Sequence, residues 1–291
     1  MNYELVDVIQ ADSENWRHQQ ARGLANDARL ITLAPDPSFI YKKGKYYQNA
    51  VNLVDLVTKR TLTPGTSLFF DKVPTIDGAE VFMNPDGIIS IIDDGIEVGE
   101  MTLYEGTRRF VKDVTYFNND GSRDYKEEYA FDGKLFSYIY YWKDKVQQIA
   151  FVNDNKQIIL RFYFYEGSLN LVTIEDPQTQ VVTASYSSMA AFAAFQVGKL
   201  VNKDDTVHVT YLGLELEVLR FTDSKNIVNL DESPFDDSGV LKGNLKMIID
   251  GTTDFIDEID VSREWYEDLK DAGTDLSKVR AIKEHGIVGE G

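Results

Sequence analysis

The chain has 291 residues, 43% hydrophobic and 27% charged, which is enough for a large buried core and for two domains. Its net charge of −18 argues against a nucleic-acid groove, which needs clustered Lys and Arg, and against an anionic membrane surface as partner. No cysteine is present, so disulfides and thiolate chemistry are excluded.

The first residues, "MNYELVDVIQADSENW", contain Glu and Asp early and lack the basic-then-apolar pattern of a signal peptide. No apolar run is long enough to span a bilayer. We therefore expect a cytoplasmic protein without membrane insertion.

Residues 1–78 are predicted to form the first part of an α/β lobe. "YELVDVI" predicts a strand, Ser13 is a candidate N-cap for a helix that reaches Asn26, and "ARLITL" predicts another strand. In "YYQNAVNLVDLVTK" four apolar residues recur at near-helical spacing: Val51, Val54, Leu56 and Val57. Alternating strands and helices are typical of an α/β layer.

Residues 79–184 are predicted to form an inserted antiparallel β-meander. Turn dipeptides recur at Asp86-Gly87, Asp94-Gly95, Glu105-Gly106, Asp120-Gly121, Asp132-Gly133, Asp144-Lys145, Asp154-Asn155 and Glu166-Gly167. Asp-Gly tolerates the positive φ angles of type I′ hairpin turns. From Asp120 the turns follow every ten to twelve residues, which leaves strands of about eight residues between them.

Residues 185–240 are predicted to continue the α/β lobe, and residues 241–291 to begin a second α/β unit or to form a C-terminal helical tail. A helix is expected from Ser187 to Leu200, and further helices at "LELEVLRF" and "SREWYEDLKDAG". Strands are expected at "TVHVTYL", "NIVNL" and "NLKMIID". The predicted fold class is α/β with a large inserted antiparallel β-meander.

The strand predicted at residues 135–142 is apolar on both faces. Leu135, Ser137, Ile139 and Tyr141 point one way, and Phe136, Tyr138, Tyr140 and Trp142 point the other. Two interpretations stay open: both faces are buried under helices, or one face or edge is presented to another protein. On the second interpretation the candidate partner-binding residues are Tyr138, Tyr140, Trp142, Tyr163 and Tyr165.

Motifs for catalysis, metal binding or cofactor binding are not found in the sequence, and we predict no catalytic residue, metal or cofactor. His18, His208 and His285 lack metal-ligand spacing, and His208 is interpreted as a strand residue. Phosphate loops and the nucleophile elbow are absent. Glu97 and Glu105 have the Glu-x7-Glu spacing of retaining glycosyltransferases but no Gly-rich loop between them.

The acidic turns also invite catalytic or calcium-binding interpretations. "NNDGSRD" and "NPDG" lack the ligand set of an EF-hand loop, and turn chemistry accounts for them. Three acidic pairs sit at turn signals, where solvated carboxylates are ordinary: Asp93-Asp94, Asp204-Asp205 and Asp236-Asp237. We interpret them as turn residues.

The hairpins of "YFNNDGSRDYKEEYAFDGKL", the helix of "SYSSMAAFAAFQVGKL" and the strand of "DTVHVTYL" resemble proteins of the bacterial accessory Sec locus, which handle serine-rich adhesins. The similarity covers roughly residues 45–260, and it is greatest to the first accessory secretion protein and the glycosyltransferase-stabilising subunit. Related teichoic-acid glycosyltransferases carry a similar insertion. The resemblance implies a GT-B-like protein with Rossmann-type lobes and an extended β-sheet inserted in the first lobe.

Active enzymes of this group need donor-phosphate basic residues and the Glu-x7-Glu pair in the second lobe, and neither is visible here. The leading hypothesis is therefore a non-catalytic, chaperone-like accessory subunit, part of a hetero-oligomer, for surface-glycoprotein glycosylation and export. Its partner would be a glycosyltransferase, a secretion subunit or a Ser/Thr-rich adhesin. Two alternatives are a sugar-nucleotide-dependent glycosyltransferase, or a fragment of one, and a stand-alone hairpin-repeat binding module such as an immunity or phage protein.

Overall fold

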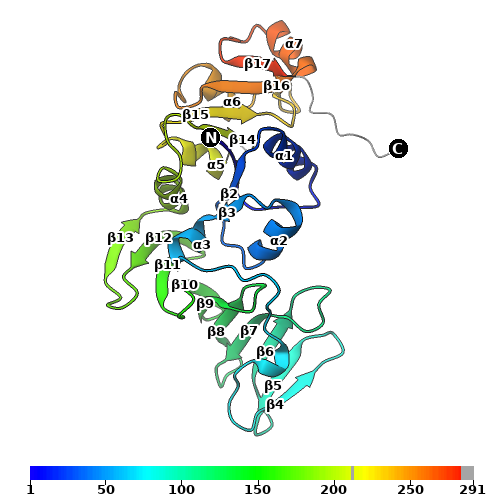
Figure 1. Cartoon of the computed structure of the whole chain (residues 1–291), viewed down its shortest axis with the longest axis vertical. Helices are drawn as coiled ribbons and strands as arrows, with labels where there is room; N and C mark the ends of the chain where they lie inside the picture. The colour runs from blue at the N-terminus through cyan, green and yellow to red at the C-terminus, as the bar shows by residue number, and fades with distance from the viewer. Residues whose placement is uncertain (211–212, 283–291) are drawn as a thin grey trace. The chain divides into compact units, whose positions relative to one another are not determined.

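A computed structural model describes residues 1–210 and 213–282 of the protein, and these divide into two compact units. The first, called here the α/β unit, comprises Met1–Ala34, Tyr46–Leu53 and the chain from Ala193 onward. The second, called here the sheet unit, comprises Pro35–Lys45 and Val54–Phe192. Figure 1 colours the chain from blue to red and shows its helices and strands.

The α/β unit contains a sheet of seven parallel strands in the order β17-β16-β15-β14-β1-β2-β3. The strands are β1 (Asn2–Val6), β2 (Arg29–Thr32), β3 (Ala50–Asn52), β14 (Thr206–Val209), β15 (Lys225–Asn229), β16 (Glu258–Ser262) and β17 (Val279–Ile282). With β1 beside β14 at the centre, this is the order of a doubly wound Rossmann-type sheet extended by one strand.

Helices alternate with these strands. They are α1 (Glu14–Ala25), α5 (Leu214–Leu219), α6 (Gly243–Ile249) and α7 (Arg263–Asp271), and two more cross the unit boundaries, α3 (Leu53–Thr58) and α4 (Met189–Val197). The side chain of Ser13 accepts a hydrogen bond from the backbone N–H of Trp16, so Ser13 caps α1 as predicted. In the described residues, 1–210 and 213–282, no helix is long and apolar enough to cross a bilayer.

The structure differs from two expectations for the C-terminal third of the chain. "NLKMIID" is predicted to be a strand, but it lies in α6, where Leu245 and Ile248 are buried three positions apart at a helical spacing. Residues 241–282, expected to start a second α/β unit or a helical tail, contribute β16 and β17 to the same parallel sheet. Tyr211, Leu212 and His285 lie outside the described residues.

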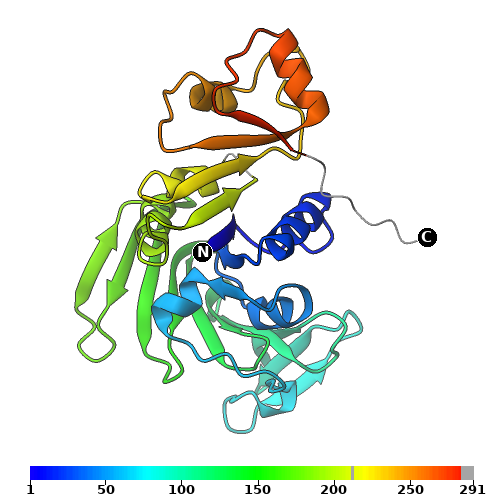
Figure 2. The same ribbon diagram turned by 45° about the horizontal axis from the view of Figure 1, so that its top comes forward.

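The sheet unit contains ten antiparallel strands in the order β13-β12-β11-β10-β9-β8-β7-β6-β5-β4 (Figure 2). The strands are β4 (Glu80–Met83), β5 (Ile89–Asp93), β6 (Ile96–Leu103), β7 (Val111–Phe117), β8 (Arg123–Tyr129), β9 (Leu135–Trp142), β10 (Lys145–Val152), β11 (Ile158–Tyr165), β12 (Ser168–Glu175) and β13 (Val182–Tyr186). The helix α2 (Phe39–Tyr46) and the 3-10 helix η1 (Phe70–Lys72) precede them. Each strand pairs with its neighbours in the chain, so this is the predicted meander.

Tight turns set the register of the meander. Asp94-Gly95, Glu166-Gly167 and Lys143-Asp144 all have positive φ at both central residues, as type I′ turns require. The turn after β9 is predicted at Asp144-Lys145, one residue too late, because Lys143 takes a positive φ of 48° without being glycine. Trp142 and Lys145 close this turn as a pair.

The fold class is confirmed as a mixed α/β chain with a parallel sheet and a large antiparallel sheet. A stand-alone hairpin module predicts that the flanking segments do not close into one domain. That expectation is wrong, because residues 2–52 and 206–282 share one parallel sheet.

Candidate partner-binding face

A row of tyrosines crosses neighbouring strands of the antiparallel sheet. Tyr116 on β7 lies opposite Tyr125 on β8, which lies opposite Tyr140 on β9. Gln148 on β10 lies opposite Tyr140 on one side and Tyr163 on β11 on the other. Directly opposed residues project from the same face of a sheet. These five side chains therefore form one line, called here the tyrosine row.

The rings of the row contact one another. The centroids of Tyr116 and Tyr125 lie 4.7 Å apart with an interplanar angle of 22°, and those of Tyr125 and Tyr140 lie 6.3 Å apart. Gly99 on β6 continues the row opposite Tyr116, and a Cβ there would lie 2.7 Å from the carbonyl oxygen of Thr115. Such cross-strand aromatic pairs each stabilise a sheet by about 0.2–1 kcal/mol.

The five predicted partner-binding residues lie on the face of the tyrosine row. Tyr138, Tyr140 and Trp142 alternate along β9, and Tyr163 and Tyr165 along β11. Trp142 and Tyr165 are each 67% exposed and Tyr140 is 36% exposed, while Tyr163 is partly buried. Tyr138 packs against a buried cluster and its ring stacks on Tyr140 at 6.2 Å. Three of the five thus offer open surface, and Tyr138 supports them.

The opposite face of the same strands is buried. Phe151, Leu160, Phe162 and Val172 form a cluster with Phe192, which is fully inaccessible. The strands β9 to β12 therefore have one dry face and one face of partly exposed tyrosines. This matches the second of the two open interpretations of the apolar strand more closely than the first.

The expected alternation along β9 holds from Ser137 to Trp142 and fails at its first two residues. Glu128 lies opposite Ser137 and Tyr129 lies opposite Leu135, so Phe136 is the extra residue of a β-bulge. As a result Phe136 joins the buried cluster of the opposite face. The correction affects no predicted binding residue.

Three hydroxyl groups of the tyrosine row, those of Tyr116, Tyr125 and Tyr140, stay protonated at neutral pH. Burial raises the pKa of Tyr116, Tyr125 and Tyr140 above the ordinary value of tyrosine. Gln148, between Tyr140 and Tyr163 in the row, has a buried amide nitrogen without a hydrogen-bond partner among the described residues. Neutral hydroxyls and an amide beside aromatic rings suit contact with a polypeptide, whose backbone offers both donors and acceptors.

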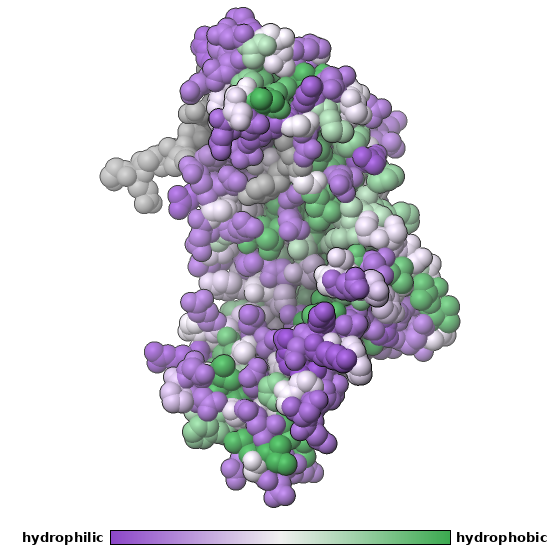
Figure 3. All heavy atoms as spheres, turned by 180° about the vertical axis from the view of Figure 1, so that it is seen from behind, coloured by the Kyte–Doolittle hydropathy of each residue, from purple (hydrophilic) through white to green (hydrophobic). Residues whose placement is uncertain are grey.

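One edge of the sheet forms a second apolar surface that the sequence did not predict. Val81, Phe82 and Met83 on β4 are 41%, 57% and 47% exposed. The strand β4 ends the sheet, so its outer backbone groups have no neighbouring strand within residues 1–210 and 213–282. Figure 3 shows apolar surface over this end of the sheet, at the bottom of the view. The run "EVFM" could have signalled a strand, but not which side of it stays open.

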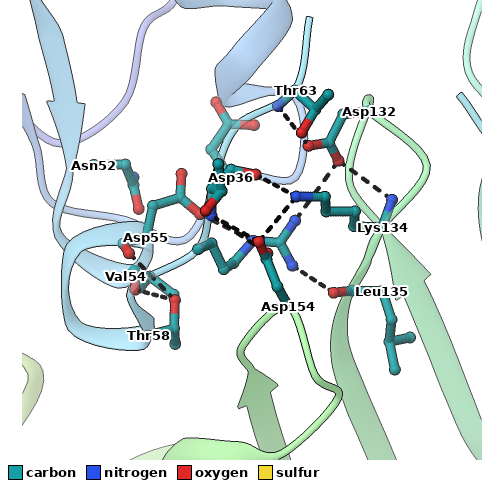
Figure 4. A network of polar contacts seen from close by, with 12 residues as sticks. Asp36, Asn52, Val54, Asp55, Thr58, Thr63, Asp132, Lys134, Leu135 and Asp154 are labelled. Carbon is teal, nitrogen blue, oxygen red and sulfur yellow. Dashed lines mark hydrogen bonds and ion pairs between the residues drawn. The ribbon is translucent and has the colours of Figure 1, made fainter. Parts of the chain in front are cut away.

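A buried ion network lies in the sheet unit near the start of β9 (Figure 4). The side chain of Arg60 is inaccessible, and its Nε lies 3.3 Å from Asp55 Oδ1 while its Nη2 lies 3.7 Å from Asp132 Oδ1. Its Nη1 donates to the carbonyl oxygen of Leu135, and its guanidinium lies 5.2 Å from the ring centroid of Phe136. The network joins α3 to the start of β9.

Carboxylates outnumber cations in this network. Burial, with the nearby Asp132, Asp36 and Asp154, raises the pKa of Asp55 to about 7 although Arg60 opposes the shift. The side chains of Arg60 and Asp132 are inaccessible to solvent. We assign the network a structural role, holding the segment from residue 54 to 68 against the sheet.

The α/β unit contains a separate buried polar cluster. Arg22 on α1 contacts Glu4 on β1 at 2.5 Å and donates to Thr210 at 2.6 Å. His208, a strand residue as predicted, lies 3.2 Å from Asn229, and burial lowers its pKa to about 4. Within residues 1–210 and 213–282 no group of His, Cys, Asp or Glu is arranged to hold a metal ion.

The residues considered for glycosyl transfer are not brought together. Glu97 lies on β6 and Glu105 in the turn after it. "SSMAAF", the candidate phosphate-binding helix start, follows the antiparallel strand β13, and the backbone N–H of Ala191 already donates to Ser188. It therefore lacks the position after a parallel strand that phosphate-binding helices of this fold occupy.

Comparisons with known proteins identify the fold. No protein-family model and no curated protein matches the sequence. Among solved structures, accessory secretory protein 1, 2 and 3 from Streptococcus pneumoniae matches with a TM-score of 0.76 at 15% identity, covering 98% of this chain and 62% of that one.

Two further structures match over a similar length. The glycosylation-associated protein complex Gap123 from Streptococcus agalactiae matches with a TM-score of 0.72 at 17% identity, covering 98% of this chain and 61% of that one. The GtfA/B complex bound to UDP and GlcNAc matches with a TM-score of 0.71 at 16% identity, covering 98% and 61%. The resemblance to accessory Sec-locus proteins is thus confirmed for the fold, and the chain spans about three fifths of the length of these proteins.

Proposed function

We propose that the protein is a non-catalytic, chaperone-like accessory subunit that binds a protein partner through the face of the tyrosine row. The partner would be a glycosyltransferase, a secretion subunit or a Ser/Thr-rich adhesin, in glycosylation and export of a surface glycoprotein. The observation that carries this proposal is one sheet face with Tyr140, Trp142 and Tyr165 exposed over a buried opposite face.

The physical basis is the concentration of aromatic surface. Aromatic side chains supply large contact area with few rotatable bonds, and they dominate the binding energy of most interfaces. Here they stand on a ten-stranded sheet, which fixes their spacing before a partner arrives. Solved structures of the same fold include multi-protein complexes, which supports a hetero-oligomer. The cytoplasm is the proposed compartment.

Substitution of Tyr140 and Trp142 together by alanine tests the proposal. Binding of a Ser/Thr-rich polypeptide and of an accessory-system glycosyltransferase would be measured by calorimetry. Loss of two anchors should weaken binding to the true partner by about 30-fold or more. The matched control is Phe221→Ala, which removes a 66% exposed aromatic ring from the α/β unit and should leave binding unchanged. Unchanged affinity of a correctly folded double variant would refute the proposal.

A sugar-nucleotide-dependent glycosyltransferase is the second candidate. The likeness to the GtfA/B complex bound to UDP and GlcNAc favours it. Calorimetry with UDP-GlcNAc distinguishes the two, because the enzyme should release heat on binding and the accessory subunit should not.

A further inference from the structure

The sheet unit contains a pocket that shares no residue with the tyrosine row. This pocket, of about 430 Å³, opens between α2, the loop at residues 63–67, and the turn joining β8 to β9. Its walls are mainly apolar and are formed by Ile40, Tyr41, Gly44, Pro64, Phe110 and Phe131. All of the lining residues belong to the sheet unit.

The aromatic wall of this pocket is fixed by packing. The ring of Phe131 lies 4.8 Å from that of Tyr41 and 5.8 Å from that of Phe110. The backbone N–H of Phe131 donates to the carbonyl oxygen of Pro37, which holds the turn beside α2. A Cβ at Gly133 would lie 2.3 Å from the backbone nitrogen of Leu68, so the turn and the loop touch closely. The pocket is therefore formed before any ligand enters.

The polar groups of the wall are already used within the protein. Thr66 donates its hydroxyl to the carbonyl oxygen of Asp132 at 2.8 Å, and Ser67 donates to those of Thr66 and Phe131. The carboxylate of Asp132 accepts from the backbone N–H of Thr63 at 3.1 Å and contacts Arg60. A saccharide needs many hydrogen-bond partners around its hydroxyls, and this wall offers few. An apolar group fits it better.

One basic residue lines the pocket, and others lie next to lining residues in the sequence, in a chain whose net charge is −18. Lys45 lines it, with its Nζ 5.5 Å from the centroid of the Tyr41 ring. Lys43 lies on the same helix, and two exposed arginines, Arg108 and Arg109, directly precede Phe110. Lys42, also on this helix, is paired with Asp36 at 2.8 Å. A ligand that places a negative charge beside an apolar group would therefore complement this site.

We propose that this pocket binds an aromatic side chain from an acidic polypeptide segment, with the carboxylates of that segment beside Lys45. The ring would fill the pocket and lie against the wall formed by Tyr41, Phe110 and Phe131. The site does not depend on the tyrosine row, so it stands or fails separately from the proposed function.

Three short peptides with blocked termini test the site. The first has phenylalanine flanked by acidic residues, the second serine flanked by acidic residues, and the third phenylalanine flanked by lysines. Binding to the full chain would be measured by calorimetry at low and high NaCl. The acidic phenylalanine peptide should bind at least about tenfold more tightly than either of the others, and salt should weaken it. Either control peptide binding as tightly as the acidic phenylalanine peptide would overturn the proposal.

Two variants locate the binding. Gly44 lies in α2, and a Cβ at this position would meet no heavy atom of another described segment within 4 Å. Gly44→Phe should therefore fill the pocket and abolish binding. This change leaves the helix intact, because phenylalanine forms helices more readily than glycine. Lys45→Glu should weaken binding of the acidic peptide by about tenfold. Lys246→Glu, the same charge change at an exposed position of α6, should leave binding unchanged. Unaltered binding to Gly44→Phe, or displacement of the peptide by N-acetylglucosamine, would contradict the proposal.

Discussion

The α/β unit and the sheet unit each bury an arginine among carboxylates, while their surfaces differ. Arg22 is 7% exposed beside Glu4 in the α/β unit, and Arg60 is inaccessible beside Asp55 in the sheet unit. Most of the exposed large hydrophobic side chains of the described residues lie in the sheet unit. Those in the α/β unit are few and scattered: Met1, Leu24, Phe195, Phe221, Val240 and Met247.

The difference follows from the two kinds of sheet. Parallel strands need crossover connections, which lay helices over both faces and bury them. An antiparallel meander needs only short turns, so one face can stay open. Polar networks therefore stabilise both units alike, whereas surface suited to a protein partner arises where the sheet is antiparallel.

Removal of each buried arginine gives the largest expected effect. Arg60→Met leaves Asp55 and Asp132 buried without their cation and should lower the free energy of unfolding of the sheet unit by about 3–5 kcal/mol. Arg22→Met should lower that of the α/β unit by a similar amount, because Glu4 is left alone. Urea unfolding followed by circular dichroism would measure both changes.

An exposed pair provides the control for these variants. Arg123 contacts Asp144 at 3.0 Å, but both side chains are about half exposed, and Arg123→Met should cost less than about 1 kcal/mol. A loss at Arg60 no larger than that at Arg123 would show that burial does not decide the energetics of these pairs.

The pH dependence of the sheet unit should follow Asp55. The pKa of Asp55 in the folded protein is about 7, above its ordinary value of 3.8. Between pH 3.8 and about 7 the folded state therefore binds more protons than the unfolded state. The contribution of Asp55 to the free energy of unfolding is present at low pH and is lost as the pH rises through about 7. Asp55→Asn should therefore gain stability relative to the unchanged protein as the pH rises from about 5 to 8. Parallel curves for the two proteins in urea unfolding would refute this.

His208 should act in the opposite sense in the α/β unit. Burial, with Arg22 and Lys225 nearby, lowers its pKa to about 4, while Asn229 and Glu258 oppose the shift. The unfolded state binds more protons between about pH 4 and 6.5, so stability from neutral His208 is lost as the pH falls through this range. His208→Gln should remove this loss of stability at low pH, which urea unfolding at a series of pH values would measure. A steeper loss of stability at low pH in the variant would contradict the prediction.

Much of the fold could be predicted from the sequence because turn chemistry is local. Asp-Gly pairs marked most hairpins, and alternating strands and helices marked the parallel sheet. The prediction was one residue late at Lys143-Asp144, where no glycine signals the positive φ. It was wrong for "NLKMIID", since a short apolar run fits a strand and a helix equally well.

The candidate site could be predicted only in part. The aromatic residues of β9 and β11 are visible in the sequence, and alternation places them on one face. Their alignment with Tyr116, Tyr125 and Gln148 depends on register across several turns. The Arg60 network could not be predicted, since it joins residues about seventy positions apart whose contact is decided by tertiary packing.

The central claim is that the partner binds the face of the tyrosine row, and fluorine NMR of the protein labelled with 5-fluorotryptophan tests it most directly. The chain has three tryptophans: Trp142 on that face, and Trp16 and Trp265 in the α/β unit. On addition of the partner, the resonance of Trp142 should shift or broaden while the other two stay unchanged. A shift of Trp16 or Trp265 with Trp142 unaffected would contradict the account.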